Sequence, residues 1–344
     1  MNSKKLFEKF CKERNIRPST KKGYISALKL YEDLNKKSIE NLFKEARNEE
    51  TRKVPLKDRK IKKRLVDFRT HLLTGNLSPN TSKVYFSKVK TFYQHFDFEL
   101  PLLPPAKYDK SYQTNYLDLP TKSHVRKAVE ISPIKLKAII LFMASSGTAK
   151  AETLNLTVSQ FIQATNDYHN GGDIKTILNA LEAKDSIVPT FYIKRIKTDK
   201  FYYTFCSPEA TEHIIRYLKT RKNLKPNNQL FEFTSSQLHE KFKQINDCMN
   251  WGFRGKYRFF RSHTLRKFHA SNITLSAETI DSLQGRSKNE IHETYIKTNP
   301  EKLKKAYISA MDNVVIFERE NQVKKQEFNI IINVFLSGKE YNII

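Results

Sequence analysis

The 344-residue sequence has few of the residues that build cross-linked or loop-rich proteins. Its three cysteines, Cys11, Cys206 and Cys248, lie far apart without CxxC or metal-ligand spacing, so we expect reduced thiols and neither disulfides nor a zinc site. Only 9 Gly and 12 Pro occur, which argues against collagen-like repeats and loop-rich barrels. No run approaches the roughly 18 apolar residues of a membrane helix. The first residues, MNSKKLFEKFCKER, lack the apolar core of a secretion signal. We therefore expect a cytoplasmic protein with no membrane partner.

Positive charge is abundant. Lys and Arg number 62 against 36 Asp and Glu, a net charge of +26, while 39% hydrophobic residues are enough for buried cores and exclude a largely disordered chain. Residues 1–110 hold 27 basic and 13 acidic residues, and the remainder is basic as well. Because each Lys or Arg on a phosphate releases condensed counterions, this balance predicts a nucleic acid gripped along the whole chain. A generally basic protein is the alternative.

The first hundred residues predict helices that follow capping residues. We expect these helices to begin at Ser19, at Asp58 and after the pair Ser78-Pro79, where an N-cap precedes a proline in the first helical position. The last of these helices carries Lys83, Lys88 and Lys90, which we predict to contact phosphates. A merely solvated face is the alternative for these lysines.

Composition changes between residues 101 and 117, where LPLLPPAKYDKSYQTNYLDLP contains four prolines. We therefore predict a helical domain over 1–103, a linker over 104–117, a second domain over 118–320 and a tail over 321–344. The apolar tail is predicted to pack either on a neighbouring copy or on its own domain.

The sequence of the second domain predicts both helices and β-strands. Helices are expected over PIKLKAIILFMASSG, over AETLNLTVSQFIQAT and over DIKTILNALEAK. The β-rich runs TFYIKRIK and FYYTFC, joined by TDK, predict a hairpin. Helices are then expected from residue 208 to about 220 and from residue 236 to about 316. The predicted fold class is mainly α with one small antiparallel β-sheet.

A set of polar residues recurs at defined spacing near the C-terminal end. His263 and Arg266 are three apart on a predicted helix that Ser262 caps, so both side chains leave the same face. LQGR follows, with Gly285 permitting a tight turn before Arg286. SKNE then predicts a capping box ahead of Tyr295. Each element alone is weak, whereas their order and spacing are specific.

On the basis of these residues, the sequence resembles the tyrosine recombinase (phage integrase) superfamily, and most of all the integrases of archaeal viruses and mobile elements. His263, Arg266, Gly285-Arg286 and Tyr295 match the family's C-terminal motif. The family's catalytic lysine lies on a β-hairpin, where Lys197 is our first choice and Lys200 the second; Arg195 is the wrong residue type for that role. The resemblance covers nearly the whole chain.

That resemblance implies a two-domain clamp around double-stranded DNA, which cuts one strand at a time through a 3′-phosphotyrosine and acts as a homotetramer at attachment sites. It implies no cofactor and no metal. Arg266 and Arg286 would hold the phosphate, and Lys197 would protonate the leaving 5′-oxygen. His263 would accept the proton of Tyr295 or bind the phosphate. Tyr307 is the second candidate for the nucleophile.

One position departs from the family pattern. In SSGTAKAETLNL, Gly147 and Glu152 are kept, but the position of the family's first arginine holds Ala149. Three interpretations stay open: Lys150 supplies the cation through a shifted turn, the chain is naturally weakened, or an arginine was deliberately replaced. A lysine would bind the transition state less well than the fork of an arginine. A DNA-binding accessory protein without activity and a type IB topoisomerase are therefore the alternative functions.

Overall fold

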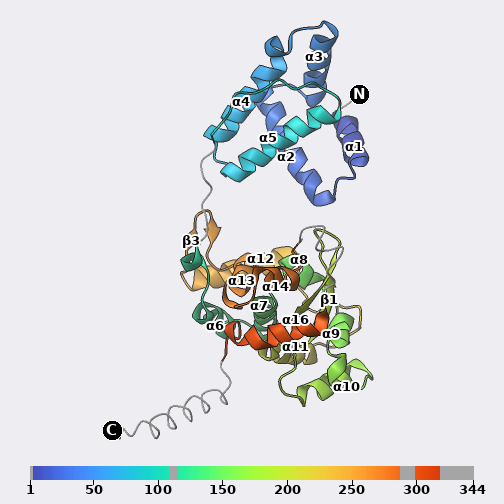
Figure 1. The fold of residues 1–344 in the computed structure, drawn as a ribbon, viewed down its shortest axis with the longest axis vertical. Coiled ribbons are helices and arrows are strands. Elements are labelled where there is room, and N and C mark those ends of the chain that lie inside the picture. The colour runs from blue at the N-terminus through green and yellow to red at the C-terminus, as the bar shows by residue number, and fades with distance from the viewer. Residues whose placement is uncertain (1–2, 108–114, 287–298, 318–344) are drawn as a thin grey trace, which may run out of the picture. The chain divides into compact units, whose positions relative to one another are not determined.

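Two compact units, residues 1–113 and 114–344, make up the chain in the computed structural model (Figure 1). The structure describes residues 3–107, 115–286 and 299–317. Within these ranges, no helix combines the length and the apolar character that crossing a bilayer requires. The chain is mainly helical with little antiparallel β-structure, which confirms the predicted fold class.

The first unit is a bundle of helices. Its helices are α1 (Ser3–Glu13), α2 (Pro18–Asn35), α3 (Ile39–Thr51), α4 (Lys60–Thr74) and α5 (Pro79–His95), with a 3-10 turn, η1, at Leu56–Asp58. α2 packs against both α4 and α5. Aromatic rings fill the centre of this unit: the buried rings of Tyr31 and Phe68 meet edge to face at 5.0 Å, and the Tyr31 hydroxyl lies 3.4 Å from that of Tyr93.

Local capping explains where these helices begin. Ser78 caps α5 as predicted, since its hydroxyl accepts a hydrogen bond from the Thr81 amide at 3.2 Å and Pro79 takes the first helical position. α2 begins one residue before the predicted Ser19. α4 begins two residues after the predicted Asp58, because Asp58 belongs to the 3-10 turn that precedes it.

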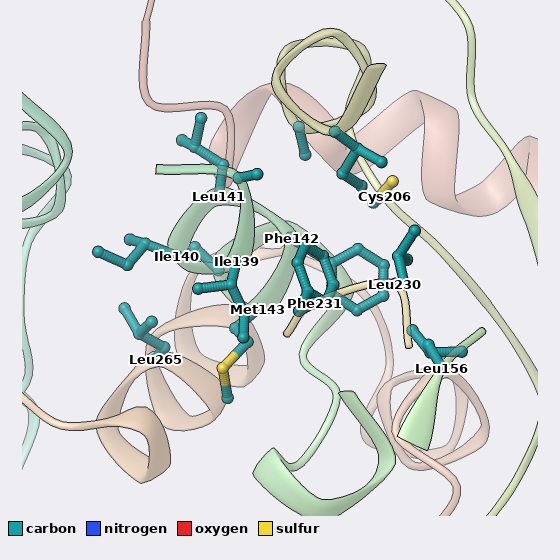
Figure 2. Packing of buried hydrophobic residues seen from close by; sticks show 14 of the residues in the cluster. Ile139, Ile140, Leu141, Phe142, Met143, Leu156, Cys206, Leu230, Phe231 and Leu265 are labelled. Carbon is teal, nitrogen blue, oxygen red and sulfur yellow. The ribbon is translucent and has the colours of Figure 1, made fainter. Parts of the chain in front are cut away.

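The second unit is built around one apolar helix. Its elements are η2 (Tyr116–Asp118), α6 (Lys122–Glu130), α7 (Ile134–Ser146), α8 (Lys150–Asn155), α9 (Val158–Ala164), η3 (Asn166–Tyr168), α10 (Ile174–Glu182), β1 (Thr190–Lys194), β2 (Phe201–Phe205), α11 (Pro208–Lys219), α12 (Ser235–Cys248), β3 (Phe253–Arg254), β4 (Tyr257–Arg258), α13 (Ser262–Asn272), α14 (Ala277–Leu283), α16 (Pro300–Ala310) and η4 (Met311–Asn313). Helix α7 packs against α11 and α13, and its residues 138–146 are all buried. Figure 2 shows Phe142 of α7 facing Phe231, with ring centroids 5.5 Å apart. A helix buried on all sides is a rigid base for the loops at its end.

The predicted β-hairpin is present, with a longer turn than expected. β1 pairs with β2 from Thr190 opposite Phe205 to Lys194 opposite Phe201. β1 therefore ends at Lys194, and residues 195–200 form the connection. The amide of Arg195 donates to the carbonyl of Lys200 at 2.7 Å and closes this loop. Arg195 and Lys197 both lie in the loop.

Two predictions about the second unit were wrong. The run from 236 to about 316 is interrupted by a second antiparallel pair, β3 and β4, because Gly252 and Gly255 adopt positive φ angles of 66° and 58° that turn the chain. The run AETLNLTVSQFIQAT forms two helices, α8 and α9, instead of one. Thr157 breaks it by capping α9 through a capping box with Gln160.

The bond between α3 and α4 predicts how the first unit responds to acid. The carboxylate of Glu45 accepts hydrogen bonds from Arg64 at 2.7 and 3.0 Å. Partial burial by itself raises the pKa of Glu45, but the bonds from Arg64 and Lys37 outweigh it and lower the pKa to about 2. Because the folded pKa lies below the unfolded value of 4.5, the stabilisation is complete above pH 4.5 and lost as the pH falls towards 2.

We expect Glu45→Gln to reduce the free energy of unfolding of this unit by about 2 kcal/mol at pH 7, and by much less near pH 2. Denaturant-dependent hydrogen exchange at the amides of α3 and α4 measures this. Glu40→Gln is the matched control, because its i,i+4 pair with Lys44 is exposed to solvent and should contribute little to stability. Equal effects of both substitutions would contradict the assigned role of Glu45.

Candidate active site

The buried guanidinium of Arg266 lies where three helices meet. Arg266 projects from α13 with 6% of its surface exposed. Its Nη1 donates to the carbonyl of Gly147 at 2.8 Å and its Nη2 to the carbonyl of Gln284 at 2.7 Å. These residues cap the C-terminal ends of α7 and α14, where unpaired carbonyls carry partial negative charge. Arg266 is therefore oriented by two helix ends, and no carboxylate of the described residues bonds to it.

Two glycines make this close approach possible. Gly147 has a φ of +64°, and a Cβ there would lie 2.5 Å from Nδ1 of His269. Gly285 has a φ of +59°, and its Cβ would lie 2.4 Å from the ring of Tyr202. Both positions thus require glycine, for the left-handed backbone and for the space. The predicted tight turn at Gly285 is present.

Gln284 of the LQGR run connects α14 to α13. Its side chain is fully buried, and Nε2 donates to the carbonyl of Arg266 at 3.1 Å and to Nδ1 of His269 at 2.9 Å. Because Nδ1 accepts this bond, the ring of His269 carries its proton on Nε2. Burial, and then the charges of Arg266 and Arg286, lower the pKa of His269 to about 3, so this histidine is neutral at physiological pH.

An ion pair that the sequence did not suggest lies beside Arg266. Glu152 of α8, 4% exposed, pairs with Arg195 at 3.2 Å between Oε1 and Nη1. The Glu152 carboxylate also accepts from the amide of Ile196 at 3.3 Å. The two residues of the pair are 43 positions apart, so no local pattern links them. The buried phenol of Tyr202, on β2, lies near both charges.

Positive charge exceeds negative charge around Arg266. Burial, and then the charge of Arg195, lower the pKa of Arg266 to about 10; Arg286 lowers it further, while Tyr202 and Glu152 act in the opposite direction. Arg266 stays protonated at neutral pH, but its charged form is disfavoured. A bound anion would relieve this strain, so the cluster has the electrostatics of an anion site.

His263 and Arg286, two further predicted site residues, lie within reach of the charge of Arg266. His263 is exposed at the start of α13, and crowding around its ring, followed by the charges of Arg261, Lys267 and Arg266, lowers its pKa. Arg286 is also exposed and pairs with Asp281 at 3.2 Å. The structure thus gathers His263, Arg266 and Arg286 into one charged region.

The two candidate lysines lie on other elements of this unit. Lys197 is exposed in the loop between β1 and β2. Lys150 begins α8, and its ammonium lies 3.5 Å from the carbonyl of Ser235 on α12.

Of the two candidate nucleophiles, Tyr295 and Tyr307, only Tyr307 lies within the residues that the structure describes. Tyr295 and the SKNE run lie outside the described residues, as does the tail. Tyr307 is fully buried in α16, and its hydroxyl donates to the carbonyl of Ser145 at 3.1 Å. Burial holds the pKa of Tyr307 well above its usual value. A phenol so enclosed has no access to a large substrate.

The three predicted phosphate-binding lysines do not share one face of α5. Lys83 and Lys90 are seven residues apart and lie on the same side of the helix. Lys88 is half-buried on another side, with its ammonium 5.0 Å from the ring of Tyr24 on α2, and burial lowers its pKa. Lys88 therefore packs within the first unit.

A basic and aromatic hairpin, β3–β4, is a surface that the sequence analysis assigned to a helix. Phe253 and Tyr257 are more than half exposed there. Arg258 stacks 5.0 Å from the centre of the Phe253 ring, and Arg261 lies 4.5 Å from that of Tyr257. The alternation of aromatic and basic residues in FRGKYR was the signal for this hairpin.

Solved structures with a similar fold were found. No protein-family model and no curated protein matches the chain. A lambda integrase dimer bound to a COC′ core site is similar with a TM-score of 0.57 at 13% identity, covering 86% of this chain and 94% of the other. A lambda integrase tetramer bound to a Holliday junction reaches 0.55 at 13% identity, covering 83% and 76%.

A third similar structure is the XerH site-specific recombinase bound to its difH substrate, with a TM-score of 0.53 at 16% identity, covering 88% of this chain and 84% of the other. At such low identity the likeness concerns the course of the backbone, and it extends over most of the chain. The chain has the fold of the tyrosine recombinases.

Proposed function

We propose that this chain is a site-specific DNA recombinase that cuts and rejoins strands through a 3′-phosphotyrosyl intermediate. The observation that carries the proposal is the excess of positive charge around Arg266, a buried guanidinium fixed by two helix ends and flanked by Arg286 and His263. The recombinase fold and the match of Tyr295 to the family motif support the same function.

Such a cluster suits phosphoryl transfer to a hydroxyl nucleophile. The pentavalent transition state concentrates negative charge on its non-bridging oxygens, and fixed cations stabilise that charge without reorganising. Two of the five guanidinium hydrogens of Arg266 are directed to main-chain carbonyls by the bonds to Gly147 and Gln284. Those bonds set the plane of the group, so its remaining hydrogens are held in place for a phosphate oxygen.

In the proposed transesterification, a bond from phosphorus to the tyrosine oxygen forms as the bond from phosphorus to the 5′-oxygen breaks. The Tyr295 oxygen attacks phosphorus, its proton passes to His263, and the 5′-oxygen leaves with a proton from Lys197. The lowered pKa of His263 supports its part, because the ring is neutral at physiological pH and has a lone pair to accept the proton. The 5′-hydroxyl of a second strand reverses these steps to rejoin the DNA.

The proposed partners are double-stranded DNA and further copies of the chain. Both units are basic, and we propose that the first, helical unit contacts DNA through Lys83 and Lys90 of α5. The β3–β4 hairpin offers a further cationic surface on the second unit. By the similarity to the lambda integrase tetramer on a Holliday junction, we propose a homotetramer on the recombining DNA.

Covalent capture tests the function and its nucleophile together. A library of randomised duplexes, each nicked so that cleavage is irreversible, is incubated with the protein, and denaturation-resistant complexes are recovered and sequenced. We expect one preferred site to accumulate. Tyr295→Phe should abolish the adduct and preserve DNA binding, since only the hydroxyl is lost.

Tyr307→Phe is the control for this experiment. It removes a buried hydrogen bond, worth about 1 kcal/mol of stability, and should leave the adduct in place. An adduct that persists in Tyr295→Phe would move the nucleophile elsewhere. Sequence-selective binding without any adduct would indicate the accessory DNA-binding protein, and an adduct without site preference would indicate a topoisomerase.

The contact by α5 predicts a change in salt dependence. Replacing Lys83 and Lys90 by Ala should weaken binding to the captured duplex and reduce the slope of log K against log salt by about 2, since each lost phosphate contact reduces the slope by about 0.9. Fluorescence anisotropy at salt concentrations from roughly 50 to 200 mM measures this slope. Lys88→Ala is the control, because its ammonium packs on Tyr24 and its loss should leave the slope unchanged. An unchanged slope in the double variant would rule out this contact.

A further inference from the structure

The ion pair between Arg195 and Glu152 has the features of a ligand site as much as those of a structural bond. Glu152 is 4% exposed and the side chain of Arg195 16%. Oε2 of Glu152 and the hydroxyl of Tyr202 are buried without a hydrogen bond to any described residue, and among those residues Nη1 of Arg195 has only the ion-pair contact with Oε1 of Glu152 at 3.2 Å. Buried polar atoms are normally satisfied, so the unpartnered Tyr202 hydroxyl and the incompletely bonded Arg195 guanidinium, both donors, point to a missing ligand that accepts hydrogen bonds.

The backbone holds Arg195 in one position. Its amide donates to Lys200 at 2.7 Å and its carbonyl accepts from Asp199 at 2.8 Å, while the next amide, of Ile196, is bound by Glu152. Phe191 and Ile193 of β1 are buried and Lys194 is exposed. By the alternation of a strand, Arg195 continues the inward face of β1 and Lys194 the outward one.

Arg195 is also next to the centre of the proposed site. Its charge is the strongest charged-group influence on Arg266, ahead of those of Tyr202, Arg286 and Glu152. Two guanidinium groups held this close repel each other unless an anion lies between them or beside both. Glu152 offsets only one of the two charges.

We propose that Arg195, from the end of β1, donates to a non-bridging oxygen of the scissile phosphate together with Arg266. This inference rests on the proposed recombinase function and names a residue for it. The pair of guanidiniums would clamp two oxygens of the phosphate, and Glu152 would orient Arg195 as helix ends orient Arg266.

The same assignment accounts for Ala149. Glu152 follows Ala149 by three positions, and Ala149 precedes the first residue of α8. The guanidinium of Arg195, which reaches Glu152 from the loop after β1, would take the place of one projecting from position 149. Lys150 is turned towards Ser235 of α12 and does not fill that place. Arg195 thus replaces the arginine that the family pattern expects at residue 149.

The test uses the full-length protein and the duplex obtained by covalent capture. Single-turnover cleavage is measured at saturating DNA for the wild type, Arg195→Ala, Arg195→Lys and the control Lys194→Ala, which removes a neighbouring charge from the outward face. We expect Arg195→Ala to slow cleavage by about 10²–10³-fold, as for other lost transition-state donors. The cleavage rate of Arg195→Lys should lie between those of the wild type and Arg195→Ala, since lysine keeps the positive charge but lacks the paired donors of a guanidinium. Lys194→Ala should change the rate by less than about twofold, in line with surface substitutions.

A modified substrate separates a phosphate contact from a structural role. In the two methylphosphonate diastereomers of the scissile linkage, a methyl group replaces one non-bridging oxygen and removes its negative charge. With one diastereomer, Arg195→Ala should slow cleavage by less than about tenfold, because the oxygen charge that Arg195 stabilises is absent from that substrate. An equal loss on the phosphate and on both methylphosphonates would overturn the proposal and make Arg195 a structural partner of Glu152.

An exchange of positions provides the second test. Ala149→Arg should change the wild-type rate little, because Arg195 already occupies the place beside Glu152. In the Arg195→Ala protein, Ala149→Arg should raise the cleavage rate by at least about tenfold, because it returns a donor whose loss costs about 10²–10³-fold in rate. A large gain from Ala149→Arg in the wild type would show that the cation is absent there and overturn the proposal. Absence of any adduct in the wild type would instead reject the proposed function itself.

Discussion

The burial of Arg266 between two helix ends is the interaction on which the arrangement of the second unit depends. Its guanidinium draws the C-terminal carbonyls of α7 and α14 together, and Gln284 fastens α14 to α13 beside it. A charge out of water needs bonded partners, so the loops at residues 147 and 284 are held where their carbonyls satisfy it. Glycine at 147 and 285 follows from the same closeness.

The site holds more positive charge than the fold needs. Burial is the main reason that the pKa of Arg266 falls to about 10, and repulsion by Arg195 and then Arg286 lowers it further. Natural proteins retain such strain where a ligand relieves it. In the proposed function, a phosphodiester with several oxygens in fixed directions would supply the missing acceptors, and Glu152 would orient a donor.

The apolar helix α7 makes this precision possible. It is packed against α11 and α13, and its own Phe142 contacts Phe231, so the end of the helix is set in a close-packed core (Figure 2). Chains that keep such an apolar centre keep the backbone course while surface and loop residues diverge, which fits a fold shared at 13–16% identity. A close-packed core transmits position over many residues, whereas a surface charge does not.

What the sequence alone determined was local. The cap at Ser78, the turn at Gly285, the β-hairpin and the proximity of His263 to Arg266 follow from spacings of a few residues, for which backbone geometry leaves little choice. The spacing of Tyr295 after Arg286 is likewise a sequence observation, which the described residues leave as a prediction. The break after Leu156 and the hairpin at 253–258 were missed because a capping threonine and two left-handed glycines outweighed the helical pattern.

Only the tertiary structure decided which charges meet. It placed Lys88 on Tyr24 and Lys150 on Ser235, and it brought Arg195 to Glu152 across 43 positions of sequence. The physical reason is that the energy of a charge depends on its burial and its neighbours in space. Those are properties of the packed chain, and residue type and local spacing do not contain them.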